Sequence, residues 1–151
     1  MIFPKPKSIQ AEGYFSVCGE IKVKLCACEG LCSGSVSTVF GEAADSGNIE
    51  LFIYREGSLG EISDEAYKIL LSENDEKARV SLYAPSEKGL IRGLFALRRM
   101  SLKNEFPAGE ITDWPSFAVR GYIEGFYGNP WKTSERPEML RLMALFGEKY
   151  G

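Results

Sequence analysis

Residues 86–100, SEKGLIRGLFALRRM, carry the clearest secondary-structure signal in the chain. Their leucines recur at helical spacing to form one apolar stripe, and two arginines near the end suit a helix C-terminus. Gly89 and Gly93 lie four residues apart and therefore share one face of this predicted helix. Each glycine costs up to about 1 kcal/mol relative to alanine in a helix interior. We therefore expect a close neighbour on that face, and favour packing against a sheet over contact with a ligand.

The segments before this helix have the composition of β-strands. Residues 65–74 and 78–85 are two β-prone runs. The residues where they meet, 74–77, include Asn74 and Asp75, which favour a turn, so the two runs predict a hairpin. Further strands are expected in residues 4–10, 14–18, 21–27 and 49–57, and a second helix over residues 31–44. Because the strands come mostly in adjacent runs, we expect an α+β fold, a mixed or antiparallel sheet with helices on one face.

The periodicity fades over residues 101–119, where Pro107 and Pro115 indicate a linker or a loose crossing strand. The predicted organisation is a small domain over residues 1–112, a linker over 113–119, and a final segment over 120–151. This last segment predicts one strand over residues 121–126 and one broadly apolar helix from about Ser134. Since 32 residues are too few to cover such a helix, we expect this segment to be poorly ordered, packed back on the domain, or exchanged between copies.

Composition excludes several kinds of function. The formal charge is -3, from 21 acidic and 18 basic residues mixed along the chain, so nucleic acid is not expected as a partner. No apolar run approaches the roughly 20 residues of a membrane span, and no signal-like apolar region follows the first lysines. We expect a cytoplasmic location by default, or a secreted protein if a signal has been removed.

Histidine is absent, which removes the commonest metal ligand and general base. The four cysteines, Cys18, Cys26, Cys28 and Cys32, allow a metal site or disulfides. Their spacing lacks paired zinc knuckles, so we expect reduced, mostly buried thiols, and neither a metal nor another cofactor.

Residues 120–131, RGYIEGFYGNPW, contain three glycines and four aromatic residues. A strand, a turn and a helix in this order form one βα unit, and ligands bind at the C-terminal ends of strands in parallel α/β folds. A core strand followed by an aromatic turn is an equally good interpretation. Glu124 has no second carboxylate close in sequence, so a pair for acid and base catalysis is not visible here.

These residues resemble the first barrel strand of glycoside hydrolase family 84, the β-N-acetylglucosaminidases that include enzymes once called hyaluronidases and those that remove O-linked N-acetylglucosamine from proteins. The matching positions are Glu124, Gly125, Phe126, Tyr127, Gly128, Pro130 and Trp131. The upstream part is similar to the small α/β domain that precedes the barrel in families 84 and 20. The resemblance is strong after Ala84 and weak between Cys18 and Gly60.

The resemblance implies that the chain is the N-terminal region of a hydrolase, with a small domain followed by a truncated first βα unit of a (β/α)8 barrel. It also implies a retaining mechanism in which the 2-acetamido oxygen of the sugar is the nucleophile, assisted by an adjacent Asp-Asp pair on a later strand. No such pair occurs in this sequence, so no catalytic residue is expected in this chain. Gly125, Phe126 and Tyr127 are the implied substrate-binding residues, and an N-acetylglucosamine-containing glycan or glycoprotein is the implied partner. The alternatives are a family 20-like β-hexosaminidase and a non-catalytic carbohydrate-binding or interaction module, and self-association through the last strand and helix is also expected.

Overall fold

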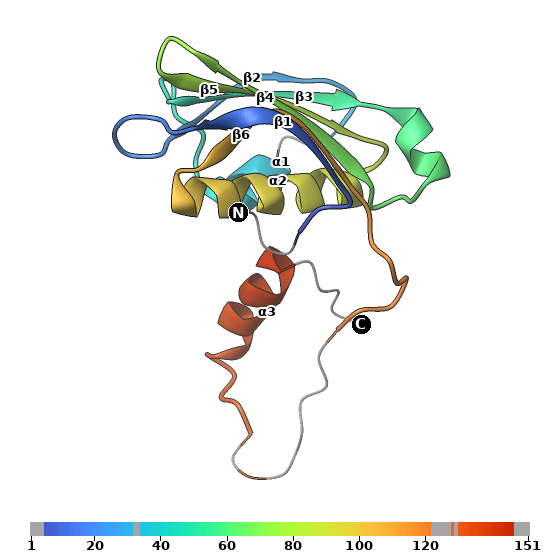
Figure 1. Cartoon of the computed structure of the whole chain (residues 1–151). Coiled ribbons are helices and arrows are strands. Elements are labelled where there is room, and N and C mark those ends of the chain that lie inside the picture. Colours follow the sequence, from blue (N-terminus) through green and yellow to red (C-terminus); the bar gives the residue numbers. More distant parts are fainter. Residues whose placement is uncertain (1–4, 32–33, 122–127, 129, 147–151) are drawn as a thin grey trace.

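The computed structural model describes residues 5–31, 34–121, 128 and 130–146. They form one sheet, three α-helices and one short 3-10 helix (Figure 1). The strands are β1 (Ser8–Phe15), β2 (Val23–Cys28), β3 (Ile49–Arg55), β4 (Tyr67–Asn74), β5 (Lys77–Ala84) and β6 (Phe106–Asp113). The helices are α1 (Gly34–Phe40), η1 (Gly57–Glu61), α2 (Glu87–Lys103) and α3 (Arg136–Leu145).

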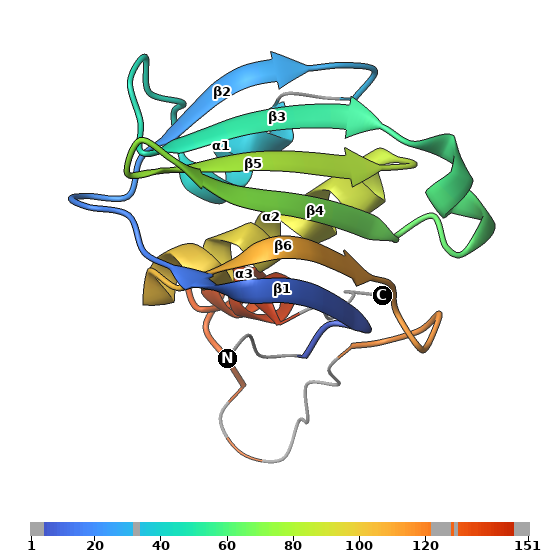
Figure 2. The same ribbon diagram turned by 45° about the horizontal axis from the view of Figure 1, so that its top comes forward.

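The sheet has six strands in the order β1-β6-β4-β5-β3-β2, as Figure 2 shows. Strands β2, β3 and β5 run parallel to their neighbours in this group, whereas β4–β5, β4–β6 and β1–β6 are antiparallel pairs. The predicted mixed sheet is therefore confirmed. The β4–β5 hairpin is also confirmed, and Asp75 and Glu76 in its turn have positive φ angles of 49° and 60°, as a tight two-residue hairpin turn requires.

Helices α1 and α2 cover one face of the sheet, as expected (Figure 1). The inward face of β3 carries Ile49, Leu51 and Ile53, which are all completely buried, and the side chains between them point outward and are half-buried. This two-residue alternation continues in β4 and β5. The apolar stripe of α2 packs onto these rows and closes the core.

The sequence of α2 fixes its position and both of its ends. Ser86 caps the first turn by accepting a hydrogen bond from the Lys88 amide at 3.2 Å. Asn104 ends the helix in the left-handed conformation. A Cβ atom at Gly89 would lie 2.3 Å from the Ala66 carbonyl oxygen, and one at Gly93 would lie 2.4 Å from Leu82 Cδ1. The expected close packing of this glycine face on the sheet is confirmed.

Two expectations for the smaller elements need correction. The helix predicted over residues 31–44 is only seven residues long and ends before Gly41, whose φ of 81° is incompatible with a continuing right-handed helix. Residues 106–113, expected to be a linker or loose strand, form β6, which lies between β1 and β4 inside the sheet. Pro107 is accommodated because it is the second residue of β6, and the strand pairs on both sides through its later residues.

Helix α3 lies on the side of α2 that faces away from the sheet (Figure 1) and contacts α2. Its proline stands in the first turn, as expected. Only Met143 of its apolar residues is buried, and Leu140, Leu142 and the following Phe146 remain about two-fifths exposed. Of the predicted strand over residues 121–126, only Gly121 is described, and it belongs to none of the six strands, so the barrel unit and the division into domains stay predictions. None of the described helices combines the length and apolarity needed to cross a membrane.

Candidate functional site

The three predicted sugar-binding residues, Gly125, Phe126 and Tyr127, lie outside the described residues. The structure describes the positions that flank them. Arg120 precedes them, and its side chain is largely buried. After them, Gly128 adopts a φ of 106°, which favours glycine, and Trp131 is half-buried.

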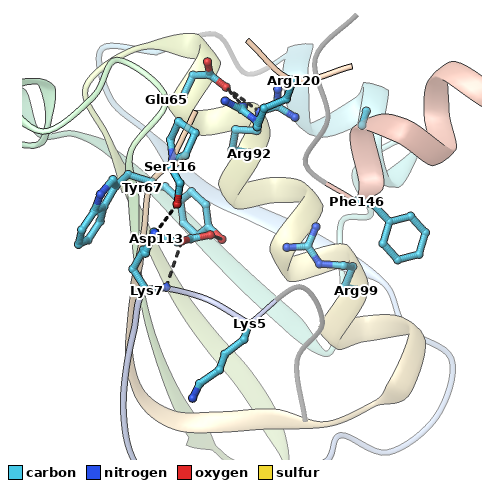
Figure 3. Close-up of a pocket in the computed structure, with 13 residues that line it drawn as sticks. Lys5, Lys7, Glu65, Tyr67, Arg92, Arg99, Asp113, Ser116, Arg120 and Phe146 are labelled. Atoms are coloured by element: carbon cyan, nitrogen blue, oxygen red, sulfur yellow. Dashed lines mark hydrogen bonds and ion pairs between the residues drawn. The ribbon is translucent and has the colours of Figure 1, made fainter. Parts of the chain in front are cut away.

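A cavity of about 270 Å³ has Arg120 in its lining (Figure 3). It lies between the start of β4, the end of β6, one face of α2 and the C-terminal end of α3. Its charged and polar lining consists of Lys5, Lys7, Glu65, Tyr67, Arg92, Arg99, Asp113, Ser116 and Arg120, and its remaining lining of Trp114, Pro115, Ala144 and Phe146. Five cationic side chains and two carboxylates therefore face this cavity.

Glu65 is the most deeply buried charged residue of this cluster, with 2% of its surface exposed. It lies just before β4, in a turn where its amide donates to Ser63 Oγ at 3.1 Å. Its Oε2 atom accepts from Arg92 Nε at 3.0 Å and from Arg120 Nη2 at 2.6 Å. Both arginine side chains are mostly buried, at 15% and 17% exposure. A carboxylate in this position is compensated by two guanidinium groups, as a buried charge must be.

Tyr67 and Asp113 form a second polar group in the cavity. The Tyr67 hydroxyl donates to Asp113 Oδ2 at 3.1 Å, and the Lys7 amide donates to Asp113 Oδ1 at 3.1 Å. The Lys7 ammonium donates to Ser116 Oγ, which lies just beyond β6. Burial, and next the Asp113 charge, raise the pKa of Tyr67 well above its ordinary value, so it stays a neutral donor. These bonds attach the chain before β1 to the end of β6.

Arg99 lies seven residues after Arg92, hence on the same face of α2 and two turns further along. Its Nη1 atom donates to the carbonyl oxygen of Leu145, the last residue of α3. Burial lowers the pKa of Arg99, and the neighbouring Tyr67 and Asp113 partly oppose this effect. Its Nε atom is buried and makes no hydrogen bond within the described residues.

This arrangement holds chain segments together through the two carboxylates of the cavity. The Glu65 carboxylate accepts hydrogen bonds from two guanidinium groups. Asp113 is likewise occupied by Tyr67 and Lys7. In the described part of the chain, no three side chains of the metal-binding types gather closely enough to hold an ion.

The cysteines differ from the expectation of mostly buried thiols. Cys18 and Cys26 are free and exposed, and Cys28 is half-buried. Cys26 and Cys28 lie on β2, which is an edge strand with a register shift between Leu25 and Ala27. Cys32 falls outside the described residues.

The fold is similar to those of several solved N-acetylhexosaminidases. An exo-β-N-acetylglucosaminidase of glycoside hydrolase family 20 from Vibrio harveyi is 18% identical, with a TM-score of 0.71 over 97% of this chain and 24% of that one. A β-N-acetylhexosaminidase from Bacteroides fragilis is 20% identical, with a TM-score of 0.67 over 96% and 31%. A protein named CpGH84B is 20% identical, with a TM-score of 0.64 over 98% and 28%. This chain therefore spans about a quarter to a third of the structures that it matches.

A family model described as β-N-acetylglucosaminidase matches residues 120–149. This range begins at Arg120 and includes the motif that the sequence resemblance rests on. The fold neighbours come from families 20 and 84 alike, so the predicted resemblance to the N-terminal region of these enzymes is confirmed.

Sequence reasoning missed the ion-pair cluster of Glu65, Arg92 and Arg120. Glu65 lies at the start of a predicted strand and Arg92 inside a predicted helix, 27 residues apart. Arg120 is 55 residues from Glu65. The available sequence signal was Arg92, a charged residue that borders the apolar face of the predicted helix. A single sequence gives no reason to pair this residue with a partner far away in the chain.

Proposed function

We propose that this chain forms the N-terminal part of a β-N-acetylglucosaminidase, a glycoside hydrolase that removes terminal N-acetylglucosamine from glycans or glycoproteins. The observation that carries the proposal is the agreement between the motif of residues 120–131 and the family model over residues 120–149. Support also comes from the fold, because neighbours that match nearly all of this chain have the names of N-acetylhexosaminidases.

The proposed mechanism is retaining and substrate-assisted, with the 2-acetamido oxygen of the sugar as the nucleophile. It needs one carboxylate to orient the acetamide group and another to act as general acid and base. The sequence contains no Asp-Asp pair, and Glu65 and Asp113 are committed to other partners in the cavity. We therefore propose that the 151-residue chain by itself is inactive and that these carboxylates belong to a following catalytic domain.

Within this proposal, Gly125, Phe126 and Tyr127 supply one strand's share of the sugar pocket. Gly125 leaves room for the pyranose hydroxyls to reach the backbone. The Tyr127 ring forms part of the pocket wall, and its flat apolar surface suits the sugar ring. The domain division at residues 113–119 is part of the same proposal.

A family 20-like β-hexosaminidase is the second candidate, favoured by the higher TM-score of the Vibrio harveyi enzyme, 0.71 against 0.64 for CpGH84B. The EGFYG sequence of residues 124–128 favours family 84. An Asp-Asp pair after a later strand of the same gene would support family 84, and an Asp-Glu pair would support family 20. A stop codon after residue 151 would instead support a non-catalytic carbohydrate-binding or interaction module.

The experiment is an assay of 4-methylumbelliferyl N-acetyl-β-glucosaminide hydrolysis by a longer polypeptide that includes the following part of the gene. We expect Tyr127→Ala to reduce kcat/KM at least tenfold. Tyr54→Ala is the matched control, because Tyr54 lies on the outer face of the sheet and stacks on Tyr83 at 5.2 Å. Equal effects of the two substitutions would contradict the proposed sugar contact, and an inactive longer polypeptide would contradict the proposed function.

A further inference from the structure

We propose that the small domain positions the two described ends of the segment 120–145: Glu65, which also pairs with Arg92 of α2, holds Arg120, and Arg99 of α2 holds the C-terminal end of α3. The proposal has two halves. Its functional half gives the small domain a role in substrate binding, and this half rests on the proposed function. The structural half concerns only contacts among described residues, and it is tested separately.

The first attachment is the cluster of Glu65, Arg92 and Arg120. Arg92 extends from α2, Glu65 lies before β4, and Arg120 begins the segment that leads to the predicted sugar-binding residues (Figure 3). The two guanidinium groups share one carboxylate oxygen at 3.0 and 2.6 Å. Because Glu65 is 2% exposed, water cannot replace either arginine without a change in the surrounding structure. Arg120 also donates to the Phe117 carbonyl oxygen, which fixes the backbone just before it.

The second attachment is the bond from Arg99 to the Leu145 carbonyl oxygen. The last carbonyl groups of a helix have no partner inside the helix, and the C-terminal end of the helix dipole attracts a cation. A guanidinium group at this place therefore satisfies an orphan acceptor and interacts favourably with the dipole. Arg99 holds the C-terminal end of α3 against α2 in this way.

The two arginines are separated by seven residues, which is about 10 Å along a helix axis. The helix that carries them is itself firmly placed, because Gly89 and Gly93 bring it against the backbone and side chains of the sheet. Leu145 is thus attached to α2 directly, and Arg120 is attached to it through the Glu65 carboxylate that Arg92 also binds, although 25 residues separate Arg120 and Leu145 in sequence. In the sequence, Gly125 follows Arg120 by only five residues.

A purely structural role would have a different signature. If the cluster only neutralised Glu65, Arg92 would suffice, and removal of Arg120 would leave the remainder of the chain unchanged. If it positions the segment, removal of Arg120 loosens the segment and spares the sheet. Exposure of the two ends of the segment to solvent can be measured locally by hydrogen exchange.

The test is hydrogen exchange of the 151-residue chain, followed by mass spectrometry of peptides, for Arg120→Met and Arg99→Met. We expect amides of residues 118–121 and 136–146 to exchange at least fivefold faster, with those of β3, β4 and β5 unchanged. Arg120→Lys should restore part of the protection, because it retains the charge. Lys88→Met is the control, since Lys88 pairs with Asp64 on the exposed surface and should change neither region.

Unchanged exchange of both ends of the segment, or equal acceleration throughout the sheet, would overturn the inference. The functional half is measured on the longer polypeptide, where we expect Arg120→Met to raise KM for the aryl glycoside at least fivefold with a smaller change in kcat. A KM equal to that of the unsubstituted enzyme would overturn the role in substrate binding. A longer polypeptide that is inactive without any substitution would contradict the proposed function. If the 151-residue chain still showed the expected hydrogen-exchange pattern, the attachment of the two ends of the segment would remain supported.

Discussion

Replacement of Gly89 by alanine tests whether α2 is fixed on the sheet by backbone contact. The added methyl carbon would lie 2.3 Å from the Ala66 carbonyl oxygen and 3.1 Å from Pro85 Cδ. Ordinary contacts of this kind are about 3.5 Å or longer, so the helix or the Ala66 backbone must move by about 1 Å. Ala66 follows Glu65 directly, and therefore the same movement disturbs the carboxylate that Arg92 and Arg120 share.

Two opposing terms set the size of the effect. Alanine improves helix propensity by about 1 kcal/mol, whereas overpacking of a tight site costs typically about 1–3 kcal/mol and more where backbone must shift. We take the upper part of that range because the obstructing atom belongs to the backbone. The expected net loss is about 1–2 kcal/mol, which corresponds to a fall in Tm of about 2–8 °C for a chain of this size.

Urea unfolding followed by circular dichroism measures this loss. Gly13→Ala is the matched control, because a Cβ atom there meets nothing within 4 Å; its free energy of unfolding should change by less than about 0.5 kcal/mol. A Gly89→Ala protein as stable as the original, or more stable, would refute the argument that backbone contact requires glycine here.

Two further predictions concern the cavity. Because its pKa is raised in the folded state, Tyr67 keeps its proton above pH 10 while the unfolded chain loses it; the unfolded state then binds fewer protons, so stability falls as pH rises. In urea unfolding at pH 9 and pH 11, Tyr67→Phe should remove about 1 kcal/mol of this fall, and an unchanged pH dependence would contradict the assignment. Glu65→Gln should lower the free energy of unfolding by on the order of 3 kcal/mol, because it leaves two largely buried guanidinium groups without their carboxylate. Lys88→Met, which removes an exposed pair, should lower the free energy of unfolding by under about 1 kcal/mol. Similar losses for the two variants would contradict the argument that the buried cluster stabilises the fold more than an exposed ion pair does.

The local features of the fold could be predicted from the sequence. The hairpin of β4 and β5 and the helix α2 depend on turn residues, caps and apolar spacing, which lie within a few positions of one another. The glycine pair of α2 correctly indicated close packing on the sheet. Strand β6 was predicted only as a linker or a loose crossing strand, because Pro107 and Gly109 weaken its β pattern. Its pairing with β1 and β4 makes it an interior strand.

The site was predictable only in part. The motif of residues 120–131 located the segment that the family model also matches, but Glu65 carries no sequence signal for its function. Its partners are 27 and 55 residues away, and the fold alone brings them to one carboxylate. Buried ion pairs of this kind follow from tertiary structure, which hydrophobic periodicity does not encode.

The most direct test of the central claim compares the 151-residue chain with the longer polypeptide in the hydrolysis of 4-methylumbelliferyl N-acetyl-β-glucosaminide. The proposed function predicts no turnover by the chain alone and turnover by the longer polypeptide, with the β-anomer of the released sugar formed first, as a retaining mechanism requires. Proton NMR of the first product identifies that anomer. Turnover by the 151-residue chain itself, or release of the α-anomer by the longer polypeptide, would contradict the account.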